Sequence, residues 1–522
     1  MILQRIRRSV AVLAAAAILG AIGVTVGLDA AQPDASARVT VRPLVFGNHR
    51  GMPGRPNIVF VLTDDLSLDL IRFMPHVLTM QDHGLTFTNY FVSDSLCCPS
   101  RASILSGRFP HDTGVLANFG PHGGFPAFHD QGEERNTFAV ALHRHGYATA
   151  MMGKYLNGYM QPRGHLGDGS SSDVPPTYVP PGWSEWDVAG WGYPEFHYKL
   201  NENGHLRRYG YRPSDYLTDV LARKGVGFIL RSARRHRPFF LELATFAPHS
   251  PFVPAPRDTR DFPRMGVPRP PNFDVVPTAA PRWLAHHQQL SAPQVAEVDS
   301  TFRRRAQSVQ AIDRMIGRIE GALTTAGVFN NTYIVFSSDN GLHTGEYRLM
   351  PGKLTAYDTD IHVPLVITGP GIRPGTSTDR MAENVDLAET FAALGHTRLD
   401  GDGHSLVPLL YGAGAARWRS AILVEHQGTR ESMRDPDRQQ PASGSPTTYE
   451  AMRTSRFLYV EYADGEREFY DLRSDPFELH NQAGSLTASQ LALLHRDLLR
   501  MKRCHDAIAC WSAMHVWNWG LV

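Results

Sequence analysis

Neither sign of charge dominates this sequence, because 52 lysines and arginines are matched by 51 aspartates and glutamates. This balance gives no indication of a nucleic-acid-binding protein or of an acidic tail. After the first 30 residues no apolar run is long enough to span a bilayer, and no internal repeat occurs. What remains is a chain of 522 residues, long enough for one large domain and a smaller one.

Cysteine is equally scarce, with four residues in the whole chain. Cys504 and Cys510 enclose a short loop, and we expect them to form a disulfide because an exported protein permits one. Cys97 and Cys98 are neighbours in the sequence, and a disulfide between adjacent residues is strained. Two alternatives stay open for this second pair: a strained disulfide, or two cysteines that are not bonded to each other.

The first 37 residues have the features of an export signal. Three arginines precede an apolar run from about residue 10 to residue 28, and small residues follow it. Gly20 and Gly23 interrupt the run, which favours a cleaved signal over an uncleaved membrane anchor. We therefore expect a secreted or extracytoplasmic protein, with no membrane association beyond a possible N-terminal anchor.

Four apolar runs are typical of strands buried on both faces of a parallel sheet, at 57–62, 149–152, 238–244 and 333–338. Polar side chains follow each run, and functional groups of open α/β sheets gather at the carboxyl ends of strands. These side chains are Asp64 and Asp65, Lys154, His249 in a proline-flanked loop, and Asp339 with Asn340. Lys353 follows in the loop after the fourth run.

The remaining pattern predicts helices, a hairpin and a second region. Helical stretches cover 137–145, 215–232 and 296–327, and Asn203-Gly204 predicts a hairpin turn. From residue 417 on, strand-like segments at 421–425, 455–462 and 468–472 precede a helix at 486–501. We therefore predict a large domain over 38–416 and a smaller α+β domain with an antiparallel sheet over 417–522.

The stretch Cys97-Cys98-Pro99-Ser100-Arg101 predicts the start of a helix, because Pro99 suits the first helical position. Backbone N–H groups and the helix dipole favour anions there. Arg101, about one turn further on, adds a positive charge at the same end. The stretch therefore predicts an anion-binding helix start that contains a sulfur atom.

The acidic strand ends predict a metal site. Asp64, Asp65, Asp339 and Asn340 offer oxygen ligands only, which suits Ca²⁺ or Mg²⁺ rather than Zn²⁺, and favours Ca²⁺ by ligand number. Arg101, Lys154 and Lys353 would add fixed positive charge around an anionic substrate. His249 is the side chain of this set that exchanges a proton near neutral pH.

The motif Cys97-x-Pro-Ser-Arg101, followed by Leu105-Ser106-Gly107-Arg108, resembles the signature of type I sulfatases. The Thr-Asp-Asp, Gly-Lys-Tyr, Ala-Pro-His and Ser-Asp-Asn-Gly segments resemble the family's further motifs in the same order. Stretches around Lys154, 179–183, 216–222 and His249 are similar to the N-acetylglucosamine-6-sulfatases and heparan endosulfatases within that family. The resemblance covers nearly all of the chain after residue 56.

The resemblance implies an alkaline-phosphatase-like α/β fold, a large mixed and mostly parallel sheet between helices, with a smaller C-terminal α+β domain. It implies that a formylglycine-generating enzyme converts Cys97 to formylglycine. It also implies one Ca²⁺ held by Asp64, Asp65, the modified Cys97, Asp339 and Asn340. Arg101, Lys154, His249 and Lys353 would then hold the nucleophile, the sulfate or the leaving oxygen. The implied substrate is a sulfated glycan, such as N-acetylglucosamine-6-sulfate, or a small sulfate ester.

One position departs from the family pattern. Many sulfatases carry a second histidine two residues after the first site lysine, where this chain has Leu156, followed by Asn157. The proton-transfer group is therefore left between His249 and a lysine. Two other functions stay open: a phosphatase, phosphodiesterase or phosphonate hydrolase of the same superfold, and a non-catalytic glycan-binding protein.

Overall fold

The computed structural model describes residues 55–161, 174–412, 418–428 and 435–516. The predicted export signal over 1–37 and the predicted domain boundary at 416–417 lie outside these ranges. Within the described ranges, no helix combines the length and the apolar character that a membrane span needs.

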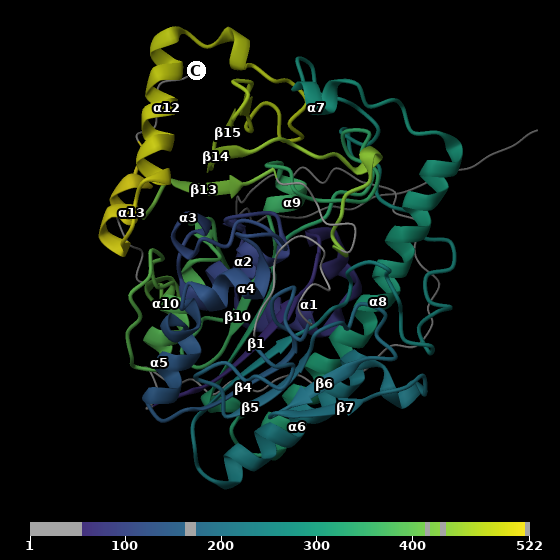
Figure 1. Cartoon of the computed structure of the whole chain (residues 1–522), viewed down its shortest axis with the longest axis vertical. Coiled ribbons are helices and arrows are strands. Elements are labelled where there is room, and N and C mark those ends of the chain that lie inside the picture. Colours follow the sequence, from purple (N-terminus) through teal and green to yellow (C-terminus); the bar gives the residue numbers. More distant parts are fainter. Residues whose placement is uncertain (1–54, 162–173, 413–417, 429–434, 517–522) are drawn as a thin grey trace, which may run out of the picture. The chain divides into compact units, whose positions relative to one another are not determined.

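A sheet of ten strands, in the order β11-β2-β10-β9-β1-β8-β4-β5-β6-β7, forms the centre of the fold (Figure 1). Its middle strands β9, β1, β8, β4 and β5 run parallel, and the strands toward both edges include antiparallel pairs. The bounds are β1 Asn57–Thr63, β2 Leu85–Phe87, β4 Ala148–Lys154, β5 Glu185–Ala189, β6 Lys199–Glu202, β7 His205–Arg208, β8 Phe239–Ala244, β9 Thr332–Ser338, β10 Leu365–Thr368 and β11 Thr376–Thr378. Strands β3 (Tyr90–Phe91) and β12 (Ala382–Glu383) form a separate pair.

The central strands are buried on both faces, as their apolar runs predict. Successive side chains of a strand point to opposite faces. Ile58 and Phe60 accordingly join one hydrophobic core, whereas Val59 and Val61 join the other. All seven residues of β1 are buried, which explains why its sequence is continuously apolar from Ile58 to Leu62 rather than alternating.

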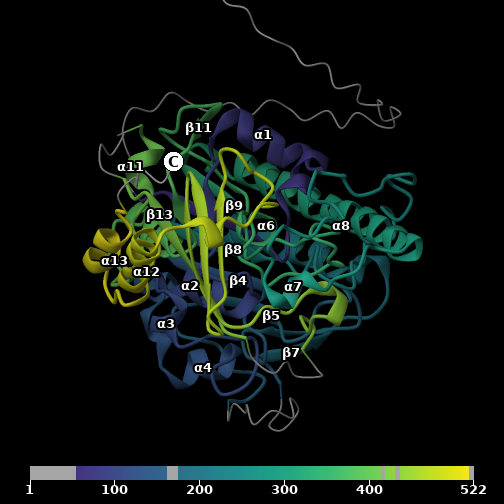
Figure 2. The same cartoon turned by 90° about the horizontal axis from the view of Figure 1, so that it is seen from above.

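Helices cover both faces of the sheet. The first core contains side chains of α2, α4, α5 and α10, and the second contains those of α1, α6 and α8. Figure 2 shows β9, β8 and β4 between α2, α3 and α4 on one side and α1, α6 and α8 on the other. The helices are α1 Pro75–His83, α2 Cys97–Ser106, α3 Pro110–Thr113, α4 Gly124–Asp130, α5 Phe138–Arg144, α6 Leu217–Arg234, α7 Arg282–Ala285, α8 Ala292–Thr325, α9 Asp358–Ile361, α10 Asp386–Leu394 and α11 Val407–Leu410.

A second, antiparallel sheet follows, with strands β13 Ala421–His426, β14 Tyr449–Thr454, β15 Phe457–Tyr462 and β16 Arg467–Asp471. Leu423 and Tyr459 pack on one face against Leu498 of α12 (Ala488–Lys502), and α13 (Ala507–Ala513) contributes to the same cluster. The other face belongs to the first core of the large sheet. The α+β character of this region is as predicted.

Three of the differences between the structure and the predicted elements have a local physical cause. Strand β14 was not predicted, because Glu450 and Arg453 interrupt its apolar pattern. Helix α2 begins at Cys97 itself, so Pro99 occupies its third rather than its first position. A proline is tolerated there because the first N–H groups of a helix have no partner within the helix. Helix α8 starts earlier than predicted, at Ala292, because Ser291 and Gln294 form a capping box.

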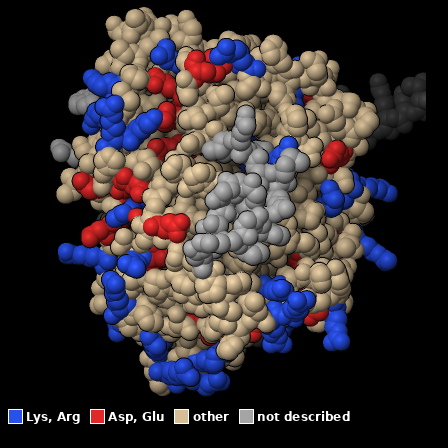
Figure 3. Space-filling view, viewed as in Figure 1, with Lys and Arg blue, Asp and Glu red and all other residues tan. Residues whose placement is uncertain are grey.

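Charged side chains of both signs are interspersed on the face seen in Figure 3, as the near-neutral net charge predicts.

Candidate active site

Four adjacent parallel strands end at one edge of the large sheet, in the order β9, β1, β8 and β4. Asp339 and Asn340 follow β9, Asp64 and Asp65 follow β1, and Lys154 is the last residue of β4. His249 lies in the loop after β8. The six polar side chains that the sequence predicts at strand ends therefore lie at the same edge of the sheet, and all six are buried.

Cys97 lies at the first residue of α2 and points at this edge. Its thiol donates a hydrogen bond to Asp64 Oδ1 at 3.2 Å, and Lys353 Nζ donates one to its Sγ at 3.0 Å. Burial, together with the carboxylates of Asp339, Asp437 and Asp64, holds the pKa of the Cys97 thiol well above its usual value. An unmodified Cys97 is therefore a neutral thiol and a poor nucleophile.

Each cation of the site is paired with a carboxylate. Lys154 Nζ lies 2.7 Å from Asp64 Oδ2, and Lys353 Nζ lies 2.7 Å from Asp65 Oδ1. Burial alone would lower the pKa of Lys353, but Asp437 and Asp65 raise it well above its usual value. Both lysines are therefore fixed positive charges.

Arg101 holds Asp339. Its Nε donates to Asp339 Oδ2 at 2.8 Å, and its Nη1 donates to the carbonyl oxygen of Lys154 at 3.1 Å. Burial would raise the pKa of Asp339, but Arg101 and the two lysines outweigh it and lower the pKa to about 2. This carboxylate is therefore ionised, which a metal ligand requires.

The ring of His249 is fixed at both nitrogens. Its Nδ1 lies 2.7 Å from the carbonyl oxygen of Ser250, which accepts a hydrogen bond, so Nε2 is the nitrogen that faces the site. Nε2 lies 2.5 Å from Asp437 Oδ1 and 3.5 Å from Asp65 Oδ2. Although burial lowers the pKa of His249, the carboxylates of Asp65, Asp437 and Asp64 raise it to about 9. The imidazole is thus ready to donate a proton.

Asp437 is a site residue that the sequence did not reveal. Its Oδ1 lies 2.5 Å from both Lys353 Nζ and His249 Nε2, and its Oδ2 accepts a hydrogen bond from Asn118 Nδ2 at 2.6 Å. It lies in a loop more than 90 residues beyond β9 and follows no apolar run. No local signal therefore separates it from the other acidic residues of the chain.

The donor set of the site fits a metal ion. Asp64, Asp65, Cys97 and His249 each offer one ligand atom, and these atoms lie within 4.8 Å of one another. The Oδ1 atom of Asn340 is buried and has no hydrogen-bond donor among the described residues. A buried acceptor without a partner is costly, and a cation beside it would satisfy this oxygen.

Aromatic side chains near the site are mainly part of the core. Trp186 is fully buried and donates its N–H to the hydroxyl of Tyr159, and Leu156 is buried beside it in the same cluster. Tyr193 is the exception, since its ring lies 4.6 Å from that of His249 and 5.1 Å from Lys154 Nζ. Its hydroxyl donates to Asn157 Oδ1 at 3.1 Å.

A cavity of about 490 Å³ adjoins the site at Asp437. Polar groups that bind hydroxyls line it, including Asn118, His426, Asp435, Asp437 and Thr447. His426 is buried, and neither of its ring nitrogens has a hydrogen-bond partner among the described residues. The carboxylate oxygen Asp94 Oδ1 is 3.9 Å from its Nδ1. The wall of the cavity therefore contains a buried imidazole without a hydrogen-bond partner.

The predicted site residues are brought together without exception. They are Asp64, Asp65, Cys97, Arg101, Lys154, His249, Asp339, Asn340 and Lys353, and all of them are buried. The predicted disulfide between Cys504 and Cys510 is present. Cys97 and Cys98 are not bonded to each other, so the alternative of a strained disulfide between them is wrong.

Comparison with known proteins matches the family described as Sulfatase over residues 56–397. The family described as N-sulphoglucosamine sulphohydrolase, C-terminal, matches residues 345–503. The N-acetylglucosamine-6-sulfatase of Homo sapiens is 35% identical over 489 residues, which cover 88% of this chain and 86% of that protein.

Two solved structures share the fold. One is a complex of a protein with its substrate D-glucosamine-2-N,6-O-disulfate, with a TM-score of 0.70, 23% identity and coverage of 86% of this chain and 98% of that one. The other is a phosphonate monoester hydrolase from Silicibacter pomeroyi, with a TM-score of 0.68, 23% identity and coverage of 87% and 96%.

Proposed function

The chain belongs to the sulfatase family, and on that basis we propose that it removes the 6-O-sulfate group from N-acetylglucosamine residues of a sulfated glycan. As a sulfatase it hydrolyses sulfate esters. The 35% identity to the human N-acetylglucosamine-6-sulfatase over most of both chains supports this substrate.

We propose that the site works with one Ca²⁺ and with a formylglycine made from Cys97 by a formylglycine-generating enzyme. Asp64, Asp65, Asp339 and Asn340 would hold the ion. The ion would neutralise the charge of an anionic substrate and orient an oxygen nucleophile. The hydrated aldehyde supplies two hydroxyls on one carbon, one to attack sulfur and one to allow release of sulfate. The high pKa of the Cys97 thiol supports this reading, because an unmodified thiol would be inactive at this position.

The chain's own residues orient the ester and move the proton. Lys154 and Lys353, which pair with the carboxylates of Asp64 and Asp65 beside Cys97, bind the oxygens of the sulfate group. His249 Nε2 donates a proton to the departing sugar oxygen, since Nδ1 is engaged by the carbonyl of Ser250. Arg101 keeps Asp339 ionised and in position.

The cavity beside Asp437 receives the sugar. Its amide, imidazole, carboxylate and hydroxyl groups suit the hydroxyls of a pyranose ring, and a volume of about 490 Å³ is ample for a monosaccharide. The cavity contacts Asp437, which binds both Lys353 and His249. A sugar in the cavity therefore lies next to the groups that act on its sulfate.

We also propose that the protein acts outside the cytoplasm, and that residues 38–416 and 417–522 are its two domains. The disulfide between Cys504 and Cys510 supports export, because such bonds persist in oxidising compartments.

The proposed substrate is tested by the release of sulfate from N-acetylglucosamine-6-sulfate. Two controls change one part each: N-acetylglucosamine-6-phosphate replaces the sulfate group, and N-acetylgalactosamine-6-sulfate inverts one hydroxyl of the sugar. We expect turnover of N-acetylglucosamine-6-sulfate and at least about tenfold lower kcat/KM for the N-acetylgalactosamine ester, because one misplaced hydroxyl leaves polar groups of the cavity unpaired. Faster turnover of the phosphate would contradict the proposed reaction, and equal turnover of both sugars would contradict the proposed substrate.

A further inference from the structure

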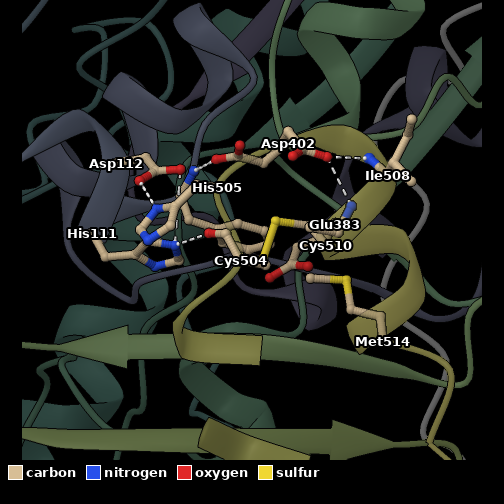
Figure 4. Close-up of a disulfide and its surroundings, with 12 residues drawn as sticks. His111, Asp112, Glu383, Asp402, Cys504, His505, Ile508, Cys510 and Met514 are labelled. Carbon is tan, nitrogen blue, oxygen red and sulfur yellow. Dashed lines mark hydrogen bonds and ion pairs between the residues drawn. A yellow bond between two sulfur atoms is a disulfide. The ribbon is translucent and has the colours of Figure 1, made fainter. Parts of the chain in front are cut away.

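A second group of metal-binding side chains lies away from the active site, between α3 and the C-terminal disulfide loop. His111, Asp112 and His505 each offer one ligand atom, and these atoms lie within 4.8 Å of one another. His505 Nδ1 is 2.6 Å from Asp112 Oδ1, and His111 Nε2 is 4.0 Å from Asp112 Oδ2. Figure 4 shows Asp112 and both histidine rings gathered on one side of the disulfide. None of them has a role in the proposed sulfatase chemistry.

His111 is held as metal-binding histidines are held. Its Nδ1 lies 2.8 Å from Glu425 Oε2, so the ring donates this N–H to a carboxylate, and its Nε2 lies 4.0 Å from Asp112 Oδ2. Metal-ligating histidines almost always donate their other ring N–H in this way, which fixes the tautomer and the orientation of the ring. The ring also stacks on Phe109, with 5.6 Å between ring centres and 9° between planes.

A backbone oxygen adds a fourth candidate ligand. The carbonyl oxygen of Cys504 lies 2.8 Å from His111 Nε2 and accepts a hydrogen bond from it. Ligands about 2.1 Å from one ion lie roughly 3–4 Å from one another. An ion that binds here takes the place of the proton on His111 Nε2, and the 2.8 Å between this nitrogen and the Cys504 oxygen must widen slightly for both to become ligands. Rotation of the His505 and Asp112 side chains then adds a second nitrogen and a carboxylate oxygen.

Both sequence neighbours of His505 are held in place by the structure. Cys504 precedes it and is bonded to Cys510. Asp506 follows it and caps α13, accepting hydrogen bonds from the N–H groups of Ile508 and Ala509 at 2.9 and 2.8 Å. The side chain of His505 is 67% exposed, so an ion can reach the group from solvent.

We propose that His111, Asp112 and His505 form a binding site for a divalent transition-metal ion of the zinc class. Two imidazoles and one carboxylate suit Zn²⁺, whereas Ca²⁺ and Mg²⁺ prefer oxygen ligands alone. The bound ion ties α3, which follows the helix that carries Cys97, to the C-terminal loop of residues 504–510. This site is independent of the proposed sulfatase reaction.

Zinc content per protein after dialysis tests the proposal, with the full chain first saturated with Ca²⁺ to occupy the active site. His505→Ala removes one exposed ligand without disturbing the core. His495→Ala is the matched control, since His495 also pairs with a carboxylate, Glu461, at 2.7 Å and is 48% exposed. It belongs to no group of three metal-binding side chains in the described part of the chain. We expect one Zn²⁺ in the wild type and in the control, and its loss in His505→Ala.

A second variant separates ligation from surface binding. Glu425→Gln keeps the shape of the side chain that orients His111 and should weaken Zn²⁺ binding about 10- to 100-fold, the usual effect of losing such a partner. Zn²⁺ should also raise the melting temperature of the wild type and the control but not that of His505→Ala. Equal zinc content in His505→Ala and the wild type, or no bound zinc in the wild type, would overturn the proposal.

Discussion

At the scale of single residues, two adjacent cysteines occupy opposite environments. Cys97 Sγ lies among Asp64, Asp65 and Lys353, whereas Cys98 belongs to the apolar core and accepts a hydrogen bond from the N–H of Asn157. A shift of one residue at the start of α2 would therefore exchange the cysteine whose sulfur reaches the charged site. The family motif predicts the same choice, because its first cysteine is the modified one.

Exchanging each cysteine for serine tests that assignment. Cys97→Ser should lower multiple-turnover activity at least about a thousandfold, because a serine ester lacks the second hydroxyl that releases sulfate. Cys98→Ser should keep activity within about tenfold and cost about 1–2 kcal/mol of stability, since it puts a hydroxyl into an apolar site. Sulfate release and denaturant unfolding measure both effects. Undiminished turnover by Cys97→Ser would refute the nucleophile assignment.

His426 is predicted to recognise the sugar rather than the sulfate. His426→Ala should lower kcat/KM for a 6-sulfated sugar about 10- to 100-fold, by the loss of one hydrogen bond in a buried cavity. Turnover of a small aryl sulfate, which does not fill the cavity, should stay near the wild-type value. Parallel assays of the two substrates measure the ratio. An equal loss for both would place His426 in support of the catalytic groups.

At the scale of elements, the sequence predicts the site wherever a ligand follows a strand. Asp64, Lys154 and Asp339 each come directly at or after an apolar run, and adjacent parallel strands bring them together. Asp437 lacks such a signal, because tertiary packing rather than a strand end brings its loop to Lys353 and His249. The predicted start of α8 came too late in the sequence, because a side-chain cap rather than the apolar stripe of the helix sets its first residue.

Glu195 predicts a pH dependence of stability at the start of α6. Its Oε2 accepts hydrogen bonds from the N–H and the hydroxyl of Thr218, both at 2.9 Å, and burial raises its pKa to about 8. The unfolded value is about 4.3, so between these values the native state holds a proton that the unfolded state has released. The contribution of Glu195 to stability is therefore fully present below about pH 4.3 and is lost as the pH rises toward 8.

The variant Glu195→Gln removes this titration. Its free energy of unfolding, relative to the wild type, should increase from pH 5 to pH 8.5, and urea unfolding at the two pH values measures the difference. Glu466→Gln, at a half-buried carboxylate 3.3 Å from Arg282, serves as the control and should show a much smaller change. A wild-type-minus-variant difference that is the same at both pH values would contradict the assigned pKa.

At the scale of the whole molecule, the small C-terminal sheet and the large sheet share a core. Ile422 and Val424 of β13 belong to the same hydrophobic cluster as Phe60 and Phe240 of the large sheet. The sequence predicted both sheets but not their shared core. Contacts between segments far apart in the chain produce no periodic pattern in the sequence of either segment. The division at residue 416 stays a prediction.

Calcium should stabilise the whole fold, because its proposed ligands come from two strands at the centre of the sheet. Chelation should lower the melting temperature, and Ca²⁺ at 100 times its Kd should restore about 2.7 kcal/mol of stability. Mg²⁺ should restore less, because it demands a stricter octahedral geometry and dehydrates reluctantly. Calorimetry of the chelated protein with each ion measures the shift, and identical curves with and without Ca²⁺ would contradict a calcium site.

Mass spectrometry of one tryptic peptide tests whether residue 97 is a formylglycine. The peptide runs from Phe73 to Arg101 and contains both Cys97 and Cys98. In protein produced together with a formylglycine-generating enzyme, the conversion makes this peptide about 18 Da lighter, and fragmentation assigns the change to residue 97. An active preparation in which Cys97 is an unmodified thiol would contradict the account.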